Sequence, residues 1–237
     1  MDLYLEFDRP LSDGELVPLR DLVKRRASGE PLQHLVGNVE FLGRTFKCDA
    51  RALIPRPETE QLCEKLVSAG TALTRVVDVG TGSGVIALTL AASWPQSAVE
   101  AVDISPHALA LARENAETHG LAARIQFHLG DLLAPINDTV DLIVANLPYV
   151  TTAEMGELSA EVRRDPHLSL EGGADGLRLI DRLADEAPRI LRGQLALEIG
   201  ANQGDAVSRM LEARKFQDIR AERDYQGRVR FLFAQYG

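Results

Sequence analysis

From Arg75 to the carboxyl end of the chain, strand-like and helix-like patterns of hydrophobic and polar positions alternate. Short apolar runs rich in Val, Ile and Leu occur at 76–79, 98–103, 125–132 and 141–146, and helical patterns lie between them. Short apolar runs bounded by turn residues are typical of buried strands. Strands that alternate with helices favour a parallel sheet covered by helices on both faces. The pattern therefore predicts an α/β fold with a mostly parallel sheet.

The last part of the chain has a different pattern. Residues 216–222 and 228–233 are two strand-like runs joined by the turn sequence Asp-Tyr-Gln-Gly at 224–227. Two such runs around a glycine-containing turn predict a β-hairpin. The sheet is therefore expected to have an antiparallel edge at its carboxyl-terminal side.

Three weaker patterns precede the alternating part. Residues 12–28 predict a short helix rich in acidic and basic side chains, opened by Ser12. Residues 39–47 predict a β-hairpin about Gly43, and residues 57–69 predict a helix that leads into the core.

These patterns divide the chain into three expected units. They are a short helical amino-terminal region (1–37), a hairpin with its connecting helix (38–70) and one main domain (71–237). Within the main domain, residues 150–176 form the longest segment without clear periodicity. Such a loop is either a lid over a site or a tolerated surface excursion.

A glycine-rich loop follows the first apolar run. It consists of Gly80, Thr81, Gly82, Ser83 and Gly84, directly before a helical pattern. Glycines let the backbone approach a ligand, and the helix amino terminus offers unpaired N–H groups. The dinucleotide pattern needs its third glycine one position later, where this chain has valine. The spacing therefore favours a ligand without phosphates, such as the adenosyl cofactor of methyl transfer.

Acidic residues lie at the ends of the next two apolar runs. Asp103 lies about 20 residues past the glycines, the offset at which a carboxylate accepts both ribose hydroxyls. Ser105 and Pro106 then predict the start of a helix. Asp131 is expected to face the adenine amino group and Leu132 the adenine ring. A solvated strand-end carboxylate is the alternative for Asp131.

The fourth apolar run ends in Asn146-Leu147-Pro148-Tyr149. Ligands of open α/β sheets bind at the carboxyl ends of strands. The side-chain oxygen of Asn146 and the carbonyl of Leu147 are acceptors that can take the two N–H bonds of one NH₂ group, and Tyr149 can stack on its face. Asn and Pro are also ordinary turn residues, so the tetrad alone fits either a site or a turn.

With these motifs together, the chain resembles the release-factor glutamine methyltransferases, also called the HemK type, within the class I adenosylmethionine-dependent methyltransferases. The most specific similarity is Leu-Ile-Pro-Arg-Pro-Glu-Thr-Glu at 53–60, and the segments 171–177 and 195–200 also match. The resemblance extends from about Gly29 to the carboxyl end. It implies the Rossmann-like sheet of class I methyltransferases.

The resemblance also implies a reaction. S-adenosyl-L-methionine is the expected cofactor, S-adenosyl-L-homocysteine the product, and the Gly-Gly-Gln glutamine of a peptide chain release factor the substrate in translation termination. The expected cofactor-binding residues are Gly80, Thr81, Gly82, Ser83, Gly84, Asp103, Asp131, Leu132 and Asn146. The expected catalytic and substrate-binding residues are Asn146, Leu147, Pro148 and Tyr149, joined at the substrate by Arg56 and Glu58. Arg56 and Glu58 either form a wall of the active site or pair structurally.

The chain departs from the family pattern in three places. Leu147 replaces the first proline of the usual Asn-Pro-Pro-Tyr tetrad, although leucine keeps the backbone carbonyl and Pro148 favours extended geometry before it. Leu132 stands where the family often has an aromatic residue. The amino-terminal helical region is short for the family, which bears on how a protein partner is recognised.

Two other functions compete with this one. Asn-Leu-Pro-Tyr is also similar to the tetrad of ribosomal RNA adenine dimethyltransferases, so an adenine amino group in RNA or DNA is the alternative substrate. The formal net charge of −9 and the pI near 5.1 favour a protein substrate and no direct nucleic-acid binding. A binding module that keeps the cofactor pocket without catalysis is the third possibility.

Composition fits one main domain. A chain of 237 residues with 45% hydrophobic content can bury one large core with a small appendage. Cys48 and Cys63 form neither a disulfide framework nor a metal pattern, and the five histidines are scattered. No apolar stretch has the length of a membrane helix or resembles a signal peptide. We therefore expect a cytoplasmic protein without a metal or a membrane partner.

Overall fold

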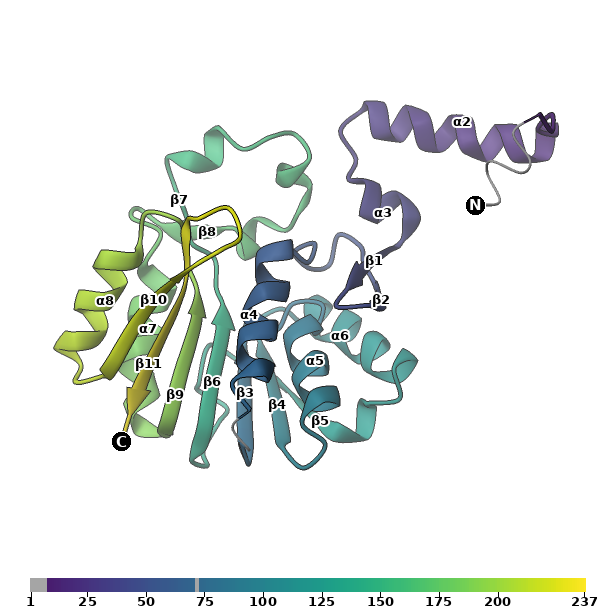
Figure 1. Ribbon diagram of the computed structural model, residues 1–237. Coiled ribbons are helices and arrows are strands. Elements are labelled where there is room, and N and C mark those ends of the chain that lie inside the picture. Colours follow the sequence, from purple (N-terminus) through teal and green to yellow (C-terminus); the bar gives the residue numbers. More distant parts are fainter. Residues whose placement is uncertain (1–7, 71–72) are drawn as a thin grey trace.

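The computed structural model describes residues 8–70 and 73–237, and in this part the main feature is a seven-stranded sheet of order β10-β11-β9-β6-β3-β4-β5 (Figure 1). From β9 to β5 all neighbours are parallel, whereas β11 is antiparallel to both β9 and β10. The predicted parallel sheet with an antiparallel edge is confirmed. Its strands are β3 (Arg75–Val79), β4 (Ala98–Asp103), β5 (Ile125–Leu129), β6 (Val140–Asn146), β9 (Leu191–Glu198), β10 (Gln217–Arg223) and β11 (Val229–Tyr236).

Helices cover both faces of this sheet because neighbouring residues of a strand point to opposite sides. Val76 belongs to a buried cluster with side chains of α4 and α5, whereas Val77 belongs to another with side chains of α7 and α8. α6 contacts β4 and the edge strand β5. The helices are α4 (Pro57–Ser68), α5 (Val85–Ser93), α6 (Pro106–Thr118), α7 (Arg178–Glu186) and α8 (Gly204–Ala213).

The amino-terminal part precedes the sheet in the chain and packs on its core through Phe41 and Phe46 of a β-hairpin. It contains α2 (Asp13–Ala27), α3 (Leu32–Val36) and the hairpin of β1 (Asn38–Phe41) with β2 (Arg44–Lys47). α2 begins after Ser12, whose backbone nitrogen donates to the Glu15 carboxylate at 2.9 Å. α2 buries none of its residues and points away from the sheet (Figure 1). The expected helix and hairpin are both present; residues 1–7 and 71–72 of the expected units lie outside the described residues.

The segment 150–176 lies at the end of the sheet where the parallel strands have their carboxyl ends (Figure 1). β7 pairs in parallel with β8, and short 3₁₀ helices lie between them. The segment is thus more ordered than its lack of periodicity indicated. Its elements are β7 (Val150–Thr151), η2 (Glu154–Gly156), η3 (Val162–Arg164), η4 (His167–Ser169) and β8 (Glu171–Gly173); η1 (Ala122–Arg124) and η5 (Ala187–Arg189) lie elsewhere.

One predicted strand is shorter than expected. The run 125–132 predicted a strand to Leu132, but β5 ends at Leu129. Leu132 has φ = +46°, in the left-handed region that no strand contains. The backbone therefore turns before the two residues that were expected to meet the adenine.

Candidate active site

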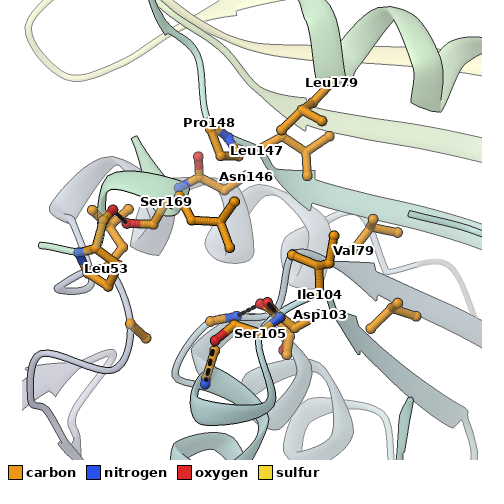
Figure 2. Close-up of a pocket in the computed structure, with 18 of the residues that line it drawn as sticks. Leu53, Val79, Asp103, Ile104, Ser105, Asn146, Leu147, Pro148, Ser169 and Leu179 are labelled. Atoms are coloured by element: carbon orange, nitrogen blue, oxygen red, sulfur yellow. Dashed lines mark hydrogen bonds between the residues drawn. The ribbon is translucent and has the colours of Figure 1, made fainter. Parts of the chain in front are cut away.

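A cavity of about 410 Å³ lies at the carboxyl ends of β3, β4 and β6. Figure 2 shows Asn146 across this cavity from Asp103 and Ser105. Most of the residues predicted for the site line it: Gly80, Thr81, Gly82, Ser83, Asp103, Asp131, Leu132, Asn146, Leu147, Pro148 and Arg56. The remaining three, Gly84, Tyr149 and Glu58, are outside its lining.

The glycine loop is tied to β4 rather than free. The backbone nitrogen of Gly80 donates to the Val102 carbonyl at 2.8 Å, and that of Gly82 donates to Oδ2 of Asp103 at 2.9 Å. Oδ1 of Asp103 accepts from the backbone nitrogen of Ser105 at 2.8 Å. Burial raises the pKa of Asp103 above its ordinary value. The loop and this carboxylate therefore form one preorganised unit with unused lone pairs on the carboxylate.

Glycine is required at position 80 for two reasons. Gly80 has φ = +75°, a conformation that side chains rarely adopt. A Cβ at this position would lie 3.0 Å from Cδ2 of Leu147. The first glycine of the loop therefore lets β3 turn directly beside the tetrad.

Asp78 holds the loop and the start of α5 through hydrogen bonds, a role that was not predicted from the sequence. Its Oδ2 accepts from Oγ1 of Thr81 at 2.6 Å and from the backbone nitrogen of Ala87 at 3.1 Å, whereas Oδ1 has no partner among the described residues. Complete burial raises its pKa to about 7. In the sequence, Asp78 could have been recognised as an acidic residue inside an otherwise apolar strand.

Asp131 and Leu132 are neighbours in the chain, and both line the cavity. Asp131 pairs with Arg182 of α7 at 2.8 Å, so part of its acceptor capacity is already used. Leu132 is buried and belongs to the core, yet it lines the cavity with a left-handed backbone. Such strain in a non-glycine residue is common at ligand sites.

Asn146 is held at the end of β6 by its amide nitrogen. Nδ2 donates to Oγ1 of Thr59 at 3.1 Å, and that hydroxyl in turn donates to Oε2 of Glu198 at 2.8 Å. No described residue donates to Oδ1 of Asn146. The side chain therefore offers an acceptor, as the sequence reasoning expected.

Glu198 was not predicted as a site residue. It ends β9, is almost completely buried, and burial raises the pKa of its carboxyl to about 7. The signal was again an acid at the end of an apolar run. Thr59 was part of the 53–60 motif but had received no role.

Arg56 and Glu58 have different partners. Arg56 pairs with Asp165 of the 150–176 segment at 2.6 Å, and Asp165 is buried and also accepts from the backbone nitrogen of Ile54 at 3.3 Å. Glu58 lies 3.9 Å from Arg228. The two residues thus do not pair with each other, and Arg56 joins the proline-rich segment to the loop above the cavity.

Metal ligands do not gather at this site. Among residues 8–70 and 73–237, no group of three His, Cys, Asp or Glu side chains could hold a metal ion. Cys48 and Cys63 are buried and unpaired. In the same ranges, no helix has the length and apolar character needed to cross a membrane.

Solved methyltransferases share this fold. The ribosomal protein L11 methylase of Lactobacillus delbrueckii subsp. bulgaricus is similar with a TM-score of 0.60 and 24% identity, over 79% of this chain and 82% of that chain. The catalytic domain of hMettl16 has a TM-score of 0.65 and 14% identity, over 97% and 94%. At these identities the similarity shows the fold alone.

Sequence comparisons show the family as well as the fold. Residues 57–163 match the family described as the methyltransferase small domain, and residues 1–37 match the PrmC N-terminal domain. A release factor glutamine methyltransferase of Geobacter sulfurreducens is 40% identical over 99% of this chain and 84% of its own length. Those of Moorella thermoacetica and Bacillus subtilis are 44% and 38% identical, over 90% and 98% of this chain and 77% and 84% of theirs. The chain belongs to the release factor glutamine methyltransferase family.

Proposed function

We propose that this protein transfers a methyl group from S-adenosyl-L-methionine to the side-chain amide nitrogen of a glutamine in the Gly-Gly-Gln motif of peptide chain release factors. Its family membership supports the reaction class. The observation that carries the proposal is the orientation of Asn146, whose nitrogen is tied to Thr59 while its oxygen is left as an acceptor. An acceptor is what a substrate NH₂ group needs.

The residues around Asp103 fit the adenosyl part of the cofactor. The Asp103 carboxylate keeps lone pairs for the two ribose hydroxyls after accepting from Gly82 and Ser105. Leu132 supplies an apolar wall for the adenine, and Asp131 stands next to it for the amino group. The glycine loop leaves room for the rest of the cofactor, and a cavity of about 410 Å³ is typical of small-molecule sites. Gly84, outside the lining, lets the loop turn into α5 with φ = +86°, and Tyr149 is proposed to stack on the face of the substrate amide.

The substrate glutamine is proposed to enter beside the tetrad. Oδ1 of Asn146 and the carbonyl of Leu147 accept the two N–H bonds of its amide, and Pro148 restricts the backbone that presents them. Arg56 forms part of the wall on this side, fixed by Asp165. Glu58 has no part in the proposal because it lies outside the lining.

When bound, the cofactor supplies a methyl group activated by its sulfonium. The substrate amide nitrogen would accept this methyl group, with S-adenosyl-L-homocysteine as the leaving group, and would then lose one proton to water. The protein contributes alignment in a desolvated cavity. As the nitrogen becomes more positive, its N–H groups are stabilised more strongly by the two acceptors, so their effect grows towards the transition state. Asn146 orients the amide and removes no proton.

The proposed substrate places the reaction in the cytoplasm, where release factors act. The net charge of −9 supports a protein substrate over a nucleic acid, whose binding depends on clustered positive charge. The proposal therefore includes no direct nucleic-acid contact.

Transfer of radiolabel from S-adenosyl-L-methionine to purified class I release factors tests the proposal. The same factors with the Gly-Gly-Gln glutamine replaced by alanine, and ribosomal RNA, serve as comparisons. Label that depends on this glutamine is the expected result. Label on RNA alone would replace the proposal with an adenine methyltransferase, and cofactor binding without transfer to any of them would favour a binding module.

A further inference from the structure

We infer that Thr59 and Glu198 are positioning residues that fix which end of the Asn146 amide faces the substrate. Neither touches the reacting atoms in the proposed reaction; both act through Asn146. The inference deepens the proposed function and rests on it.

Three elements bring these side chains together. Asn146 on β6 and Glu198 on β9 are register partners of adjacent parallel strands, each at the carboxyl end of its strand. Thr59 belongs to the first turn of α4, which packs against β9. Its hydroxyl lies 2.8 Å from Oε2 of Glu198 and 3.1 Å from Nδ2 of Asn146. The sheet and the helix thus place one hydroxyl between a carboxylate and an amide.

The direction of the two hydrogen bonds follows from their donors. A hydroxyl has one hydrogen, and the ionised form of Glu198, which prevails above its pKa of about 7, accepts only. The hydrogen of Thr59 is therefore committed to Glu198, and the hydroxyl presents a lone pair to Asn146. Only the NH₂ end of the Asn146 amide can pair with a lone pair. Oδ1 is therefore turned towards the cavity, where the glutamine amide requires an acceptor.

Removal of either partner would release this constraint. Without the Glu198 carboxylate, the Thr59 hydrogen is free to donate to the oxygen of Asn146, which flips the amide. The flipped amide presents its NH₂ group to the substrate NH₂ group. Two donors facing each other make no hydrogen bond, so the substrate nitrogen would lose its alignment.

Burial of Glu198 is difficult to explain by stability alone. A buried carboxylate is costly unless it is paired, and Glu198 forms no ion pair within the described residues. Burial raises the pKa of Glu198, and the charge of Glu58 adds to this shift. Hydrogen bonds from Thr59 and from the Asn146 side chain, and the charge of Arg230 on β11, act in the opposite direction. Since an apolar residue of similar size would avoid the cost, a role in orientation accounts for the acid.

Two substitutions on different elements test the inference. Thr59→Val keeps the shape and removes the hydroxyl, and Glu198→Met keeps the approximate length and removes the acceptor. Each is expected to lower kcat for release-factor methylation by about 10-fold or more, because misalignment at a reacting centre has effects of this size. The dissociation constant of S-adenosyl-L-methionine, measured by calorimetry, is expected to stay within about 3-fold, because the contacts proposed for the ribose and adenine do not involve either residue. Glu198→Met is also expected to melt at an equal or higher temperature than the wild type.

Two further variants complete the design. Thr59→Ser restores a hydroxyl at the same place and is expected to recover most of the kcat that valine loses. Thr89→Val is the matched control, because Thr89 is also a buried helical threonine and lies outside the lining of the cavity. Its Oγ1 has no partner in the part of the chain that the structure describes. This control should leave kcat unchanged.

The outcomes distinguish failure of the positioning role of Thr59 and Glu198 from failure of the proposed methyl transfer. Lower kcat in Thr59→Val and Glu198→Met, with recovery in Thr59→Ser and cofactor binding retained, supports the positioning role. Wild-type kcat in either first variant, no recovery in Thr59→Ser, or loss of folding in both would overturn it. A wild-type protein that methylates no release factor would instead overturn the proposed function, and with it this assignment.

Discussion

Asp103 and Gly82 are joined by a hydrogen bond of 2.9 Å from the backbone nitrogen of Gly82 to Oδ2 of Asp103. The bond holds the glycine loop at the end of β3 against the end of β4. Burial disfavours the charged form of Asp103, whereas the hydrogen bond from the loop N–H group favours it. The same hydrogen bond fixes the orientation of the carboxylate. This relationship explains how one acid both shapes the loop and offers acceptors to a ligand.

Asp103→Ala is expected to weaken cofactor binding. A hydrogen bond to a charged group contributes about 1.5–3 kcal/mol, so the dissociation constant of S-adenosyl-L-methionine should rise about 10- to 100-fold. Calorimetry on the purified variant measures this change. Asp138→Ala is the control, because this acid is 70% exposed and outside the cavity lining. An unchanged dissociation constant in Asp103→Ala would contradict the ribose assignment.

Leu147→Pro is expected to keep activity, because proline keeps the carbonyl that is proposed to bind the substrate. Leu147 is a buried core residue that covers Gly80, so some stability should be lost. Leu147→Ala is the comparison: it loses the same packing, about 2–5 kcal/mol, but leaves the backbone free to rotate. Steady-state kcat in the proline variant should equal or exceed that of the alanine variant. A proline variant that binds cofactor but has the lower kcat would show that the backbone at this position has another geometry.

Asp165→Asn is expected to loosen the 150–176 segment. The buried Asp165 carboxylate pairs with Arg56 and accepts from Ile54, and such charged hydrogen bonds contribute about 1.5–3 kcal/mol each. Trypsin should therefore cut faster after the exposed Arg163 and Arg164, and KM for the release factor should rise.

Glu161→Gln is the matched comparison for that experiment. Glu161 of the same segment pairs with Arg26 at 2.9 Å, and the side chains of Arg26 and Glu161 are 45% and 40% exposed, whereas Asp165 is buried. Exposed pairs contribute about 0–1 kcal/mol, so cleavage should barely change. Equal cleavage rates for the two variants would show that the Arg56–Asp165 pair does not hold the segment.

Stability should fall as the pH rises through the range set by Asp78. Folding raises the pKa of this carboxyl from 3.8 to about 7, so between these values the folded state binds more protons than the unfolded state. The contribution of Asp78 to the free energy of unfolding is therefore fully present below pH 3.8 and is lost as the pH rises to about 7. The free energy of unfolding falls by at most about 1.4 kcal/mol per pH unit because of this group.

Urea unfolding of the wild type and Asp78→Asn at several pH values from 5 to 8 measures this term. The asparagine variant should show a smaller decrease in the free energy of unfolding with rising pH, and the exposed Asp138→Asn should behave like the wild type. Parallel pH profiles for wild type and Asp78→Asn would contradict the raised pKa.

Much of the architecture could be predicted because it depends on local periodicity. Apolar runs fix the strands, and the carboxyl ends of parallel strands necessarily meet at one edge, which brings Asp103 and Asn146 to one cavity. Ser105 caps α6 as its position before Pro106 predicted.

The remaining features depend on contacts between distant segments. Asp131 pairs with Arg182, 51 residues later in the chain, and no local sequence pattern predicts such a partner. The left-handed backbone of Leu132 is imposed by its surroundings, since leucine itself disfavours it. Thr59 and Glu198 meet only because α4 packs over the end of β9. Acids within apolar runs were the one sequence signal for Asp78 and Glu198.

The most direct test of the central claim locates the methyl group. A release factor is incubated with S-adenosyl-L-methionine and either the wild-type protein or Asn146→Ala, and the peptide containing Gly-Gly-Gln is sequenced by tandem mass spectrometry. The account predicts one methyl group on the glutamine side-chain amide with the wild type, and turnover lower by about 100-fold with Asn146→Ala. A methyl group on another residue, or undiminished turnover in the variant, would contradict it.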